Sequence, residues 1–249
     1  DGADREDGES GEEVAAGVTH LAGLQRNWAP DPGVRPQVHA LSGRRLGTVK
    51  PVGAAFRAIL CAMANPLARA QYMLAAHLPR QLPPDGGFEV AFAGRSNAGK
   101  SSALNALCQQ NALARVSKTP GRTQQLVYFG LPQYPDRFLV DLPGYGYAKV
   151  PHDLREHWQA FLDNYFRTRI ALRGLVVVMD IRHPLKDYDR HMLGYAVERG
   201  LPAHALLTKA DKLSRGGAAN AVQAVKRDLA KSYGDTVGVQ AFSGASKLG

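Results

Sequence analysis

The sequence FEVAFAGRSNAGKSSALNAL, residues 88–107, gives the strongest indication of the fold. Its largely apolar beginning is typical of a buried strand, and its end mixes apolar and polar residues as an amphipathic helix does. Between the two, Gly94 to Ser101 fit the P-loop pattern GxxxxGK[ST]. Glycines let the backbone wrap around an anion, and the helix that begins at the lysine adds its positive end. The stretch therefore predicts a phosphate-binding loop between a strand and a helix.

The residue types of this loop indicate a nucleoside triphosphate with a metal ion. We expect Lys100 to reach the β- and γ-phosphates and the Ser101 hydroxyl to ligate Mg²⁺. A chance match on a glycine-rich turn is the alternative, but the flanking strand and helix patterns argue against it. Kinases, ATPases and GTPases all use such a loop, so it does not identify the base. The residues predicted to bind here are Gly94, Arg95, Ser96, Asn97, Ala98, Gly99, Lys100, Ser101 and Ser102.

The rest of the chain alternates short apolar runs with longer amphipathic ones, which is the pattern of a parallel sheet flanked by helices. It predicts a three-layer α/β domain of the P-loop NTPase class over residues 88–249, with a mostly parallel six-stranded sheet and helices on both faces. The apolar runs after the first are 124–130, 137–144, 175–180, 204–211 and 237–244, and the expected helices are 100–111, 152–168, 187–199 and 217–232.

The residues before this domain have a different composition. Residues 1–62 are predominantly polar, aperiodic and contain glycine and proline, which predicts disorder. Residues 63–87 are expected to form an N-terminal helix, from about Pro66 to Leu78, and a linker whose sequence QLPPDGG (81–87) would stop that helix.

Guanine is indicated by LLTKADK, residues 206–212, which resembles the [NT]KxD motif of GTPases. The Asp211 carboxylate can accept from both N1–H and the exocyclic amine of guanine, whereas adenine offers neither donor there. Lys209 would pack its stem over the base plane. A helix N-terminus is the alternative for so short a motif. The motif lies two strands after the magnesium motif DxxG, described next, and this position supports the guanine interpretation. Predicted base contacts are Thr208, Lys209, Ala210 and Asp211, and then Phe242, Ser243 and Gly244 in the SAK-like segment 242–247.

A magnesium and switch motif is expected at DLPG, residues 141–144, which fits DxxG. Asp141 would hold Mg²⁺ through a water, and the Gly144 N–H would meet the γ-phosphate, so that losing this phosphate frees the following loop. Leu142 and Pro143 complete the predicted contact. We assign catalytic roles to Lys100, Gly144 and the threonine described next.

The segment SKTPGRTQ, residues 117–124, lies between these motifs, where GTPases keep a threonine that closes on Mg²⁺. Thr123 is our choice, with Thr119 as the rival, and a plain turn built on Pro120 and Gly121 is compatible with both. The predicted metal ligands are Ser101, Thr123 and Asp141. The predicted nucleotide contacts in this segment and just after it are Gly121, Arg122, Thr123, Gln124 and Gln125.

Two positions bear on the rate of hydrolysis. Many GTPases place a glutamine directly after DxxG to orient the attacking water, but here the residue is Tyr145. We therefore expect slow intrinsic hydrolysis or another element that positions the water. Asn97 suggests a second effect, because related GTPases with asparagine at this position can use K⁺ as a cationic helper. This remains a hypothesis at the level of the sequence.

Composition and charge indicate which binding partners and which cellular compartment to expect. The net charge is +9, although residues 1–13 hold seven acids and one arginine, so the body of the chain is strongly basic. Such a body favours phosphate-rich partners, RNA above all, or an anionic membrane surface. Cys61 and Cys108 lack metal-ligand spacing and indicate reduced thiols in the cytoplasm. The N-terminus is unlike a signal peptide, and the most apolar stretch, 53–78, is interrupted by charge and proline, so we expect no membrane span.

With these motifs in this order, the chain resembles the EngB family of bacterial ribosome-biogenesis GTPases, from about Met63 to its end. The runs around Tyr145 and Tyr147 and in IRHPLKD are far more specific than the generic GTPase motifs. The matching stretches are GRSNAGKSSALNAL (94–107), SKTPGRTQ (117–124), VDLPGYGYAKV (140–150), MDIRHPLKDYD (179–189) and LLTKADKL (206–213).

The resemblance implies a TRAFAC-class GTPase that binds GTP and GDP with Mg²⁺ and hydrolyses GTP slowly. It also implies binding to the large ribosomal subunit, through rRNA and ribosomal proteins, during late assembly, and a requirement in cell division and septation. We expect a cytoplasmic monomer. The alternative is a GTP-gated RNA- or ribosome-binding module with negligible hydrolysis; a P-loop kinase or ATPase and a septal scaffold are weaker rivals. Candidate rRNA contacts, with solvated helix faces as the alternative, are Arg167, Arg169, Arg173, Arg182, Lys186 and Arg190.

The chain departs from the family pattern at both ends. Family members usually begin a short way before the phosphate-binding loop, so that residues 1–62 are expected to be an unusual extension or a misassigned start ahead of Met63. The family also continues past the SAK-like segment into a final helix, whereas this chain stops at Gly249. We expect one face of the sheet near 237–242 to be bare without that helix.

Overall fold

The structure is a computed structural model that describes residues 65–114, 125–145 and 152–246, with the side chains of helix α4 (His152–Thr168) described from Gln159 onward. The predictions for residues 1–62, for the segment 117–124 and for the last three residues lie outside these ranges.

Within the described residues, a seven-stranded sheet forms the centre of the fold, in the strand order β1-β3-β4-β2-β5-β6-β7. Strands β4, β2, β5, β6 and β7 are parallel neighbours, whereas β3 runs antiparallel to both β4 and β1. The predicted α/β class with a mostly parallel sheet is thus confirmed. The strands are β1 (Gln71–Ala76), β2 (Phe88–Gly94), β3 (Leu126–Leu131), β4 (Tyr134–Asp141), β5 (Leu172–Asp180), β6 (Ala203–Thr208) and β7 (Val237–Ala241).

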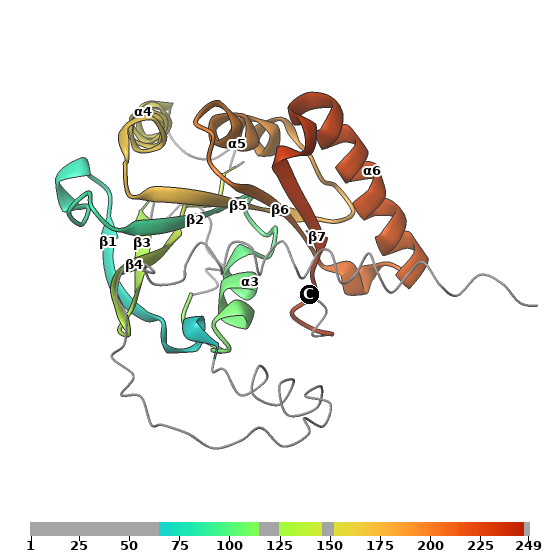
Figure 1. Cartoon of the computed structure of the whole chain (residues 1–249), viewed down its shortest axis with the longest axis horizontal. Coiled ribbons are helices and arrows are strands. Elements are labelled where there is room, and N and C mark those ends of the chain that lie inside the picture. The colour runs from blue at the N-terminus through green and yellow to red at the C-terminus, as the bar shows by residue number, and fades with distance from the viewer. Residues whose placement is uncertain (1–64, 115–124, 146–151, 247–249) are drawn as a thin grey trace, which may run out of the picture.

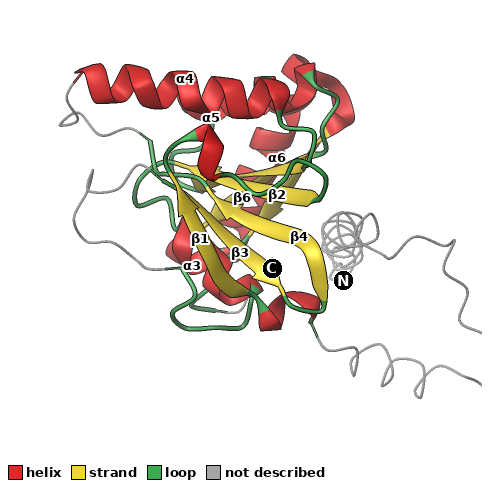
Figure 2. Cartoon of the chain, turned by 90° about the vertical axis from the view of Figure 1, so that its left-hand side faces the viewer, coloured by secondary structure: helices red, strands yellow, loops and turns green. Residues whose placement is uncertain are grey.

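Helices cover both faces of this sheet (Figure 1). One face carries the short helix α3 (Lys100–Leu107), and the other carries α4 (His152–Thr168), α5 (Asp187–Glu198) and α6 (Arg215–Tyr233). The three long helices match the predicted ranges within two residues at each end, whereas α3 ends four residues earlier than expected. Each face has its own core, because alternate strand residues point to opposite sides. Figure 2 shows the long helix α4 lying along the outside of one layer.

The helix predicted from Pro66 to Leu78 is wrong. The structure has a 3₁₀ turn (Pro66–Arg69), then strand β1, then a second 3₁₀ turn (Pro79–Gln81). Asn65 caps the first turn by accepting from the Leu67 N–H at 2.9 Å, and β1 then pairs with β3. A tertiary ladder of this kind overrides a weak local helix preference. The sheet therefore has seven strands in place of six.

The parallel register brings the sequence motifs to one edge of the sheet. Phe92 of β2 lies beside Asp141 of β4, Gly94 beside Val178 of β5, and Asp180 of β5 beside Thr208 of β6. These are the carboxyl ends of the strands, where open α/β sheets bind their ligands. The phosphate-binding loop, the DxxG motif and the TKAD motif leave the sheet side by side.

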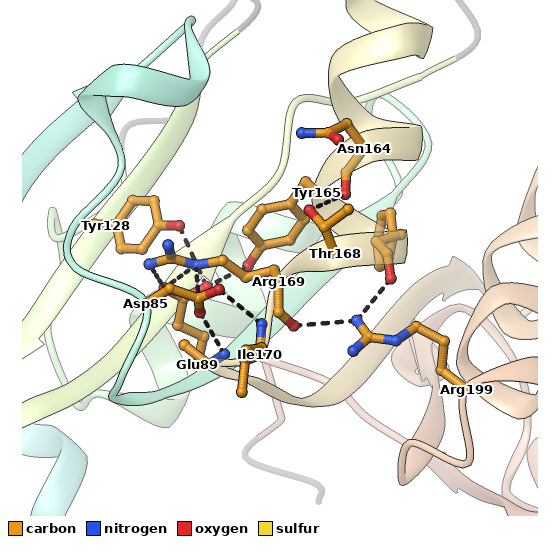
Figure 3. Close-up of polar contacts among 11 residues, drawn as sticks. Asp85, Glu89, Tyr128, Asn164, Tyr165, Thr168, Arg169, Ile170 and Arg199 are labelled. Atoms are coloured by element: carbon orange, nitrogen blue, oxygen red, sulfur yellow. Dashed lines mark hydrogen bonds and ion pairs between the residues drawn. The ribbon is translucent and has the colours of Figure 1, made fainter.

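A buried ion pair lies at the opposite end of β2 (Figure 3). Glu89 is fully buried, and its carboxylate accepts from the Arg169 guanidinium at 2.5 and 3.0 Å. The Tyr165 hydroxyl donates to the second carboxylate oxygen at 2.7 Å, and the Tyr128 hydroxyl lies 3.3 Å from it. Each carboxylate oxygen of Glu89 thus has two hydrogen-bond donors, as a buried carboxylate requires.

This cluster joins the C-terminal end of α4 to the sheet. Nearby, Asp85 accepts from the backbone N–H groups of Ile170 and Ala171 at 3.0 and 2.7 Å, just ahead of β5. Because Arg169 is buried in this network, it cannot belong to an RNA-binding surface, and that prediction is wrong.

Replacing Arg169 by leucine leaves the Glu89 carboxylate buried without its cation, which typically costs about 3–5 kcal/mol. We expect urea denaturation of Arg169→Leu to show a loss of that order. Arg167→Leu, an exposed position two residues earlier, should change the free energy of unfolding by less than about 0.5 kcal/mol. Adding Glu89→Leu to Arg169→Leu should restore part of the loss. Equal, small effects of the two single substitutions would contradict this assignment.

Candidate nucleotide-binding site

The phosphate-binding loop is a tight turn between β2 and α3. The Ala98 N–H bonds to the Arg95 carbonyl at 3.0 Å, Asn97 adopts a left-handed φ of 63°, and Gly99 caps α3 with a φ of 95°. Such a φ is readily adopted by glycine and is tolerated by asparagine. Successive N–H groups of a turn of this type line a concave anion site, and the start of the helix adds to it.

The DxxG motif is held against this loop by backbone contacts. The Leu142 N–H donates to the Phe92 carbonyl at 3.0 Å, and the Ser96 N–H donates to the Tyr145 carbonyl at 3.0 Å. A Cβ on Gly144 would lie 2.8 Å from the Ser96 Oγ and 3.2 Å from the Ser96 backbone N and Cα, so a larger residue here would crowd the backbone of the loop. The Leu142 side chain is buried in the core, so any ligand contact at this position can come only from its backbone.

Lys100 and Asp141 meet at the bottom of the site. The Lys100 ammonium pairs directly with an Asp141 carboxylate oxygen, and both side chains are largely buried. Burial raises the pKa of Asp141, and the Lys100 charge opposes that shift. The Lys100 ammonium could therefore pair with phosphate, and the Asp141 carboxylate could serve a metal ion.

The donor set here fits Mg²⁺. Ser101 follows Lys100 and is half-buried, so a hydroxyl and the Asp141 carboxylate offer hard oxygen ligands. Within residues 65–114, 125–145 and 152–246, no group of three or more His, Cys, Asp or Glu side chains could form an all-protein metal site. Magnesium needs none, because it keeps several waters and takes phosphate oxygens with one or two protein ligands.

Tyr145, the residue after DxxG, is engaged by α5. Its hydroxyl donates to Asp189 at 2.6 Å, and its ring stacks on Tyr188 at 4.2 Å between centroids. Asp189 also accepts from the Lys186 N–H at 3.0 Å. Burial raises the pKa values of both Tyr145 and Asp189. The side chain at the usual glutamine position is therefore committed to a structural contact.

The TKAD segment contacts the phosphate-binding loop directly. The Thr208 hydroxyl lies within hydrogen-bond reach of the carbonyls of Ala98 and Met179. Lys209 has a left-handed φ of 61°, and its ammonium donates to the Asn97 carbonyl at 2.7 Å. These contacts fix the TKAD segment, which is predicted to bind the base, relative to the phosphate-binding loop.

The segment after β7 contacts the carboxylate of Asp211, the residue predicted to recognise the base. The Ser243 hydroxyl donates to Asp211 at 2.6 Å, and the Lys212 ammonium lies 3.3 Å from the other carboxylate oxygen. The hydrogen bond from Ser243 is the main cause that lowers the pKa of Asp211, so the carboxylate is charged at neutral pH. The Phe242 carbonyl accepts from the Ala210 N–H at 3.1 Å, while the Phe242 ring packs in the core.

The remaining predicted positions are less central or fall outside the description. Pro143 is half-buried, whereas Ser102, Gly244 and the Arg95 side chain are exposed. Gln125 lies just before β3, and its amide is 3.3 Å from His77 Nδ1. Thr123, with its neighbours 121, 122 and 124, lies outside the described residues, so its predicted role is unchanged.

Sequence reasoning missed two acidic residues of this region, Asp180 and Asp189, and it named Arg182 only as a candidate rRNA contact. All lie in the run MDIRHPLKDYD, residues 179–189, which connects β5 to α5. Asp180 directly follows the apolar residues LVVVM, and a carboxylate at the carboxyl end of a central strand was the available signal.

Comparison with known proteins agrees with this geometry. A family model described as "50S ribosome-binding GTPase" matches residues 89–209. The probable GTP-binding protein EngB of Xanthomonas oryzae pv. oryzae (strain PXO99A) is 72% identical over 181 residues, which are 73% of this chain and 86% of that protein. The chain belongs to the EngB family of GTP-binding proteins. The EngB relative of Stenotrophomonas maltophilia (strain K279a) is 73% identical over 181 residues and matched over 90% of its length.

A solved structure supports the EngB-type fold. The crystal structure of a probable GTP-binding protein engB aligns over 64% of this chain and 91% of its own, with a TM-score of 0.50 and 19% identity. Membership of this GTPase family implies GTP binding by the P-loop and, in general, GTP hydrolysis. None of the described helices is both long and apolar enough to span a bilayer.

Proposed function

We propose that the protein binds GTP and GDP with Mg²⁺, hydrolyses GTP slowly and acts as a switch in assembly of the large ribosomal subunit. The observation that carries the nucleotide part is the direct contact of Thr208 and Lys209 with the carbonyls of Ala98 and Asn97. Through these bonds a guanine-specific segment and a phosphate-binding loop form one site. A kinase or ATPase would have no use for the oriented Asp211 carboxylate.

The chemistry needs little from the protein beyond position and charge. Lys100 would leave Asp141 for the β- and γ-phosphates, and Ser101 and Asp141 would hold Mg²⁺, directly and through water. The metal supplies charge neutralisation on the phosphate oxygens when it is bound. Gly144 would offer its N–H to the γ-phosphate, and Thr123 is our choice for the closing threonine. Donors fixed in advance in this way stabilise developing charge without reorganisation.

Slow turnover follows from the engagement of Tyr145. A side chain that donates to Asp189 and stacks on Tyr188 is not available to orient an attacking water. An activating partner or another residue must then supply that function. The same observation supports a second candidate function, a GTP-gated RNA- or ribosome-binding module in which hydrolysis is negligible.

The proposed partner is the large ribosomal subunit. The net charge of +9 suits rRNA, and the matching family model is described as ribosome-binding. Among the predicted contacts, Arg167, Arg173 and Lys186 are exposed. Arg182 and Arg190 are paired with Asp180 and Asp228 and are weaker candidates. A role in cell division and septation is proposed from the family resemblance, and a cytoplasmic location is proposed from the cysteine content as well; we also propose a monomer.

Large subunits should raise the GTP turnover of this protein well above its intrinsic rate. Single-turnover phosphate release, measured with and without purified subunits, separates the two candidate functions. Strong stimulation favours the switch, and binding without stimulation favours the module. Lys100→Met, which removes the phosphate cation, should abolish turnover in both conditions. If the subunits neither bind nor stimulate, the proposed partner is wrong.

Potassium should accelerate hydrolysis relative to sodium if Asn97 helps to hold a cation beside the phosphates. Asn97 is exposed in the phosphate-binding loop, where its side-chain oxygen could bind such an ion. Asn97→Gly keeps the left-handed backbone and removes that oxygen, so it should lose the potassium effect. Equal turnover of the wild-type protein in matched potassium and sodium buffers would overturn this proposal.

A further inference from the structure

The run of residues 179–189, from the end of β5 into the start of α5, touches two predicted nucleotide motifs. Its end contacts the residue after DxxG, through Asp189 and Tyr145. Its beginning contacts the TKAD segment, because Asp180 pairs with Thr208 in the β5–β6 ladder and its side chain reaches Lys209. The proposed function assigns no role to Asp180.

The Asp180 carboxylate contacts two cationic side chains, those of Arg182 and Lys209. Arg182 forms a fork with it, with Nε 2.9 Å from one carboxylate oxygen and Nη2 2.6 Å from the other. The Lys209 ammonium lies 2.9 Å from the oxygen that also accepts from Nη2. The Asp180 side chain is only 16% exposed, so these bonds are partly shielded from water. The bonds from Arg182 are the leading cause that lowers the pKa of Asp180, which keeps it charged.

Lys209 is thereby held at two points. Its ammonium donates to the Asn97 carbonyl at 2.7 Å and to Asp180 at 2.9 Å, and its backbone is already fixed in a left-handed conformation. A lysine stem has many rotamers and loses considerable entropy when it is confined. Because the two acceptors, the Asn97 carbonyl and the Asp180 carboxylate, lie on different elements, they fix the path of the Lys209 side chain across the site. That path crosses the position expected for the base.

We infer that Asp180, oriented by Arg182, is a positioning residue for guanine-nucleotide binding that acts through Lys209. The inference rests on the proposed nucleotide site. Asp211 recognises the donors on the edge of the base, whereas Asp180 sets the lysine that covers its plane. Asp180 should therefore govern affinity for the nucleotide and leave the discrimination between guanine and other purines to Asp211.

A purely local role is the competing explanation. The Asp180 carboxylate also accepts from the Arg182 N–H at 3.1 Å, and the Asp180 carbonyl accepts from the His183 N–H at 2.9 Å, as in a turn. If this were its whole function, removing the charge would destabilise the turn but would not depend on whether Lys209 is present.

The test is a double-mutant cycle on the full chain, read by fluorescent GDP titration with Mg²⁺. Asp180→Asn keeps the side-chain shape and should weaken GDP binding about tenfold, the effect of losing one charge-assisted contact. In a Lys209→Met background the same substitution should have no further effect. The ratio of GDP to inosine diphosphate affinity should be unchanged by Asp180→Asn. The exposed Asp187→Asn, in the same run, is the matched control and should bind GDP like the wild type.

Equal weakening by Asp180→Asn in the presence and absence of the Lys209 side chain would overturn the inference, because the effect would not pass through that lysine. So would an affinity no different from that of the Asp187 control. Failure of the wild-type chain to bind GDP at all would overturn the proposed function and this inference together. Tight wild-type binding with an additive cycle would overturn this inference alone.

Discussion

The site depends on the hydrogen bonds that join the TKAD segment to the backbone carbonyls of the phosphate-binding loop. Thr208 reaches Ala98, and Lys209 reaches Asn97, so two segments more than a hundred residues apart share one geometry. The approach is close enough that a Cβ on Gly99 would lie 3.3 Å from the Thr208 hydroxyl. A nucleotide bound to these segments as proposed would have its base and its phosphate chain held at a fixed separation. Such a site would select ligands that carry both groups.

The segment that follows DxxG is linked to the same assembly and also to the far end of the sheet. Tyr145 bonds through its backbone to the phosphate-binding loop and through its side chain to Asp189 on α5. Helix α4 comes next in the chain, and the Glu89–Arg169 ion pair anchors the residues at its C-terminal end. In the proposed switch, the γ-phosphate would act near Tyr145, ahead of a helix whose C-terminal end is anchored to the sheet.

Much of this arrangement could be predicted from local sequence, because the motifs carry their own chemistry. The P-loop, DxxG and TKAD patterns and the apolar runs before them predicted which residues would gather at the carboxyl edge of the sheet. Features that depend on distant pairing could not be predicted. Strand β1 exists because β3 offers an antiparallel partner, and the Gln71–Ala76 segment alone has no decisive period. Arg169 looked like a surface arginine because its partner Glu89 is 80 residues away.

We propose that the phosphate-binding loop and the TKAD segment form one guanine-specific site. Titration of the purified chain with fluorescent GDP, GTP, ATP and xanthosine diphosphate, beside Asp211→Asn, tests it most directly. We predict that guanine nucleotides bind at least about 100-fold more tightly than ATP. The variant should lose this preference and gain affinity for xanthosine diphosphate, whose C2 carbonyl can accept from the new amide. Similar affinity for GTP and ATP, or a variant that keeps the guanine preference, would contradict the account.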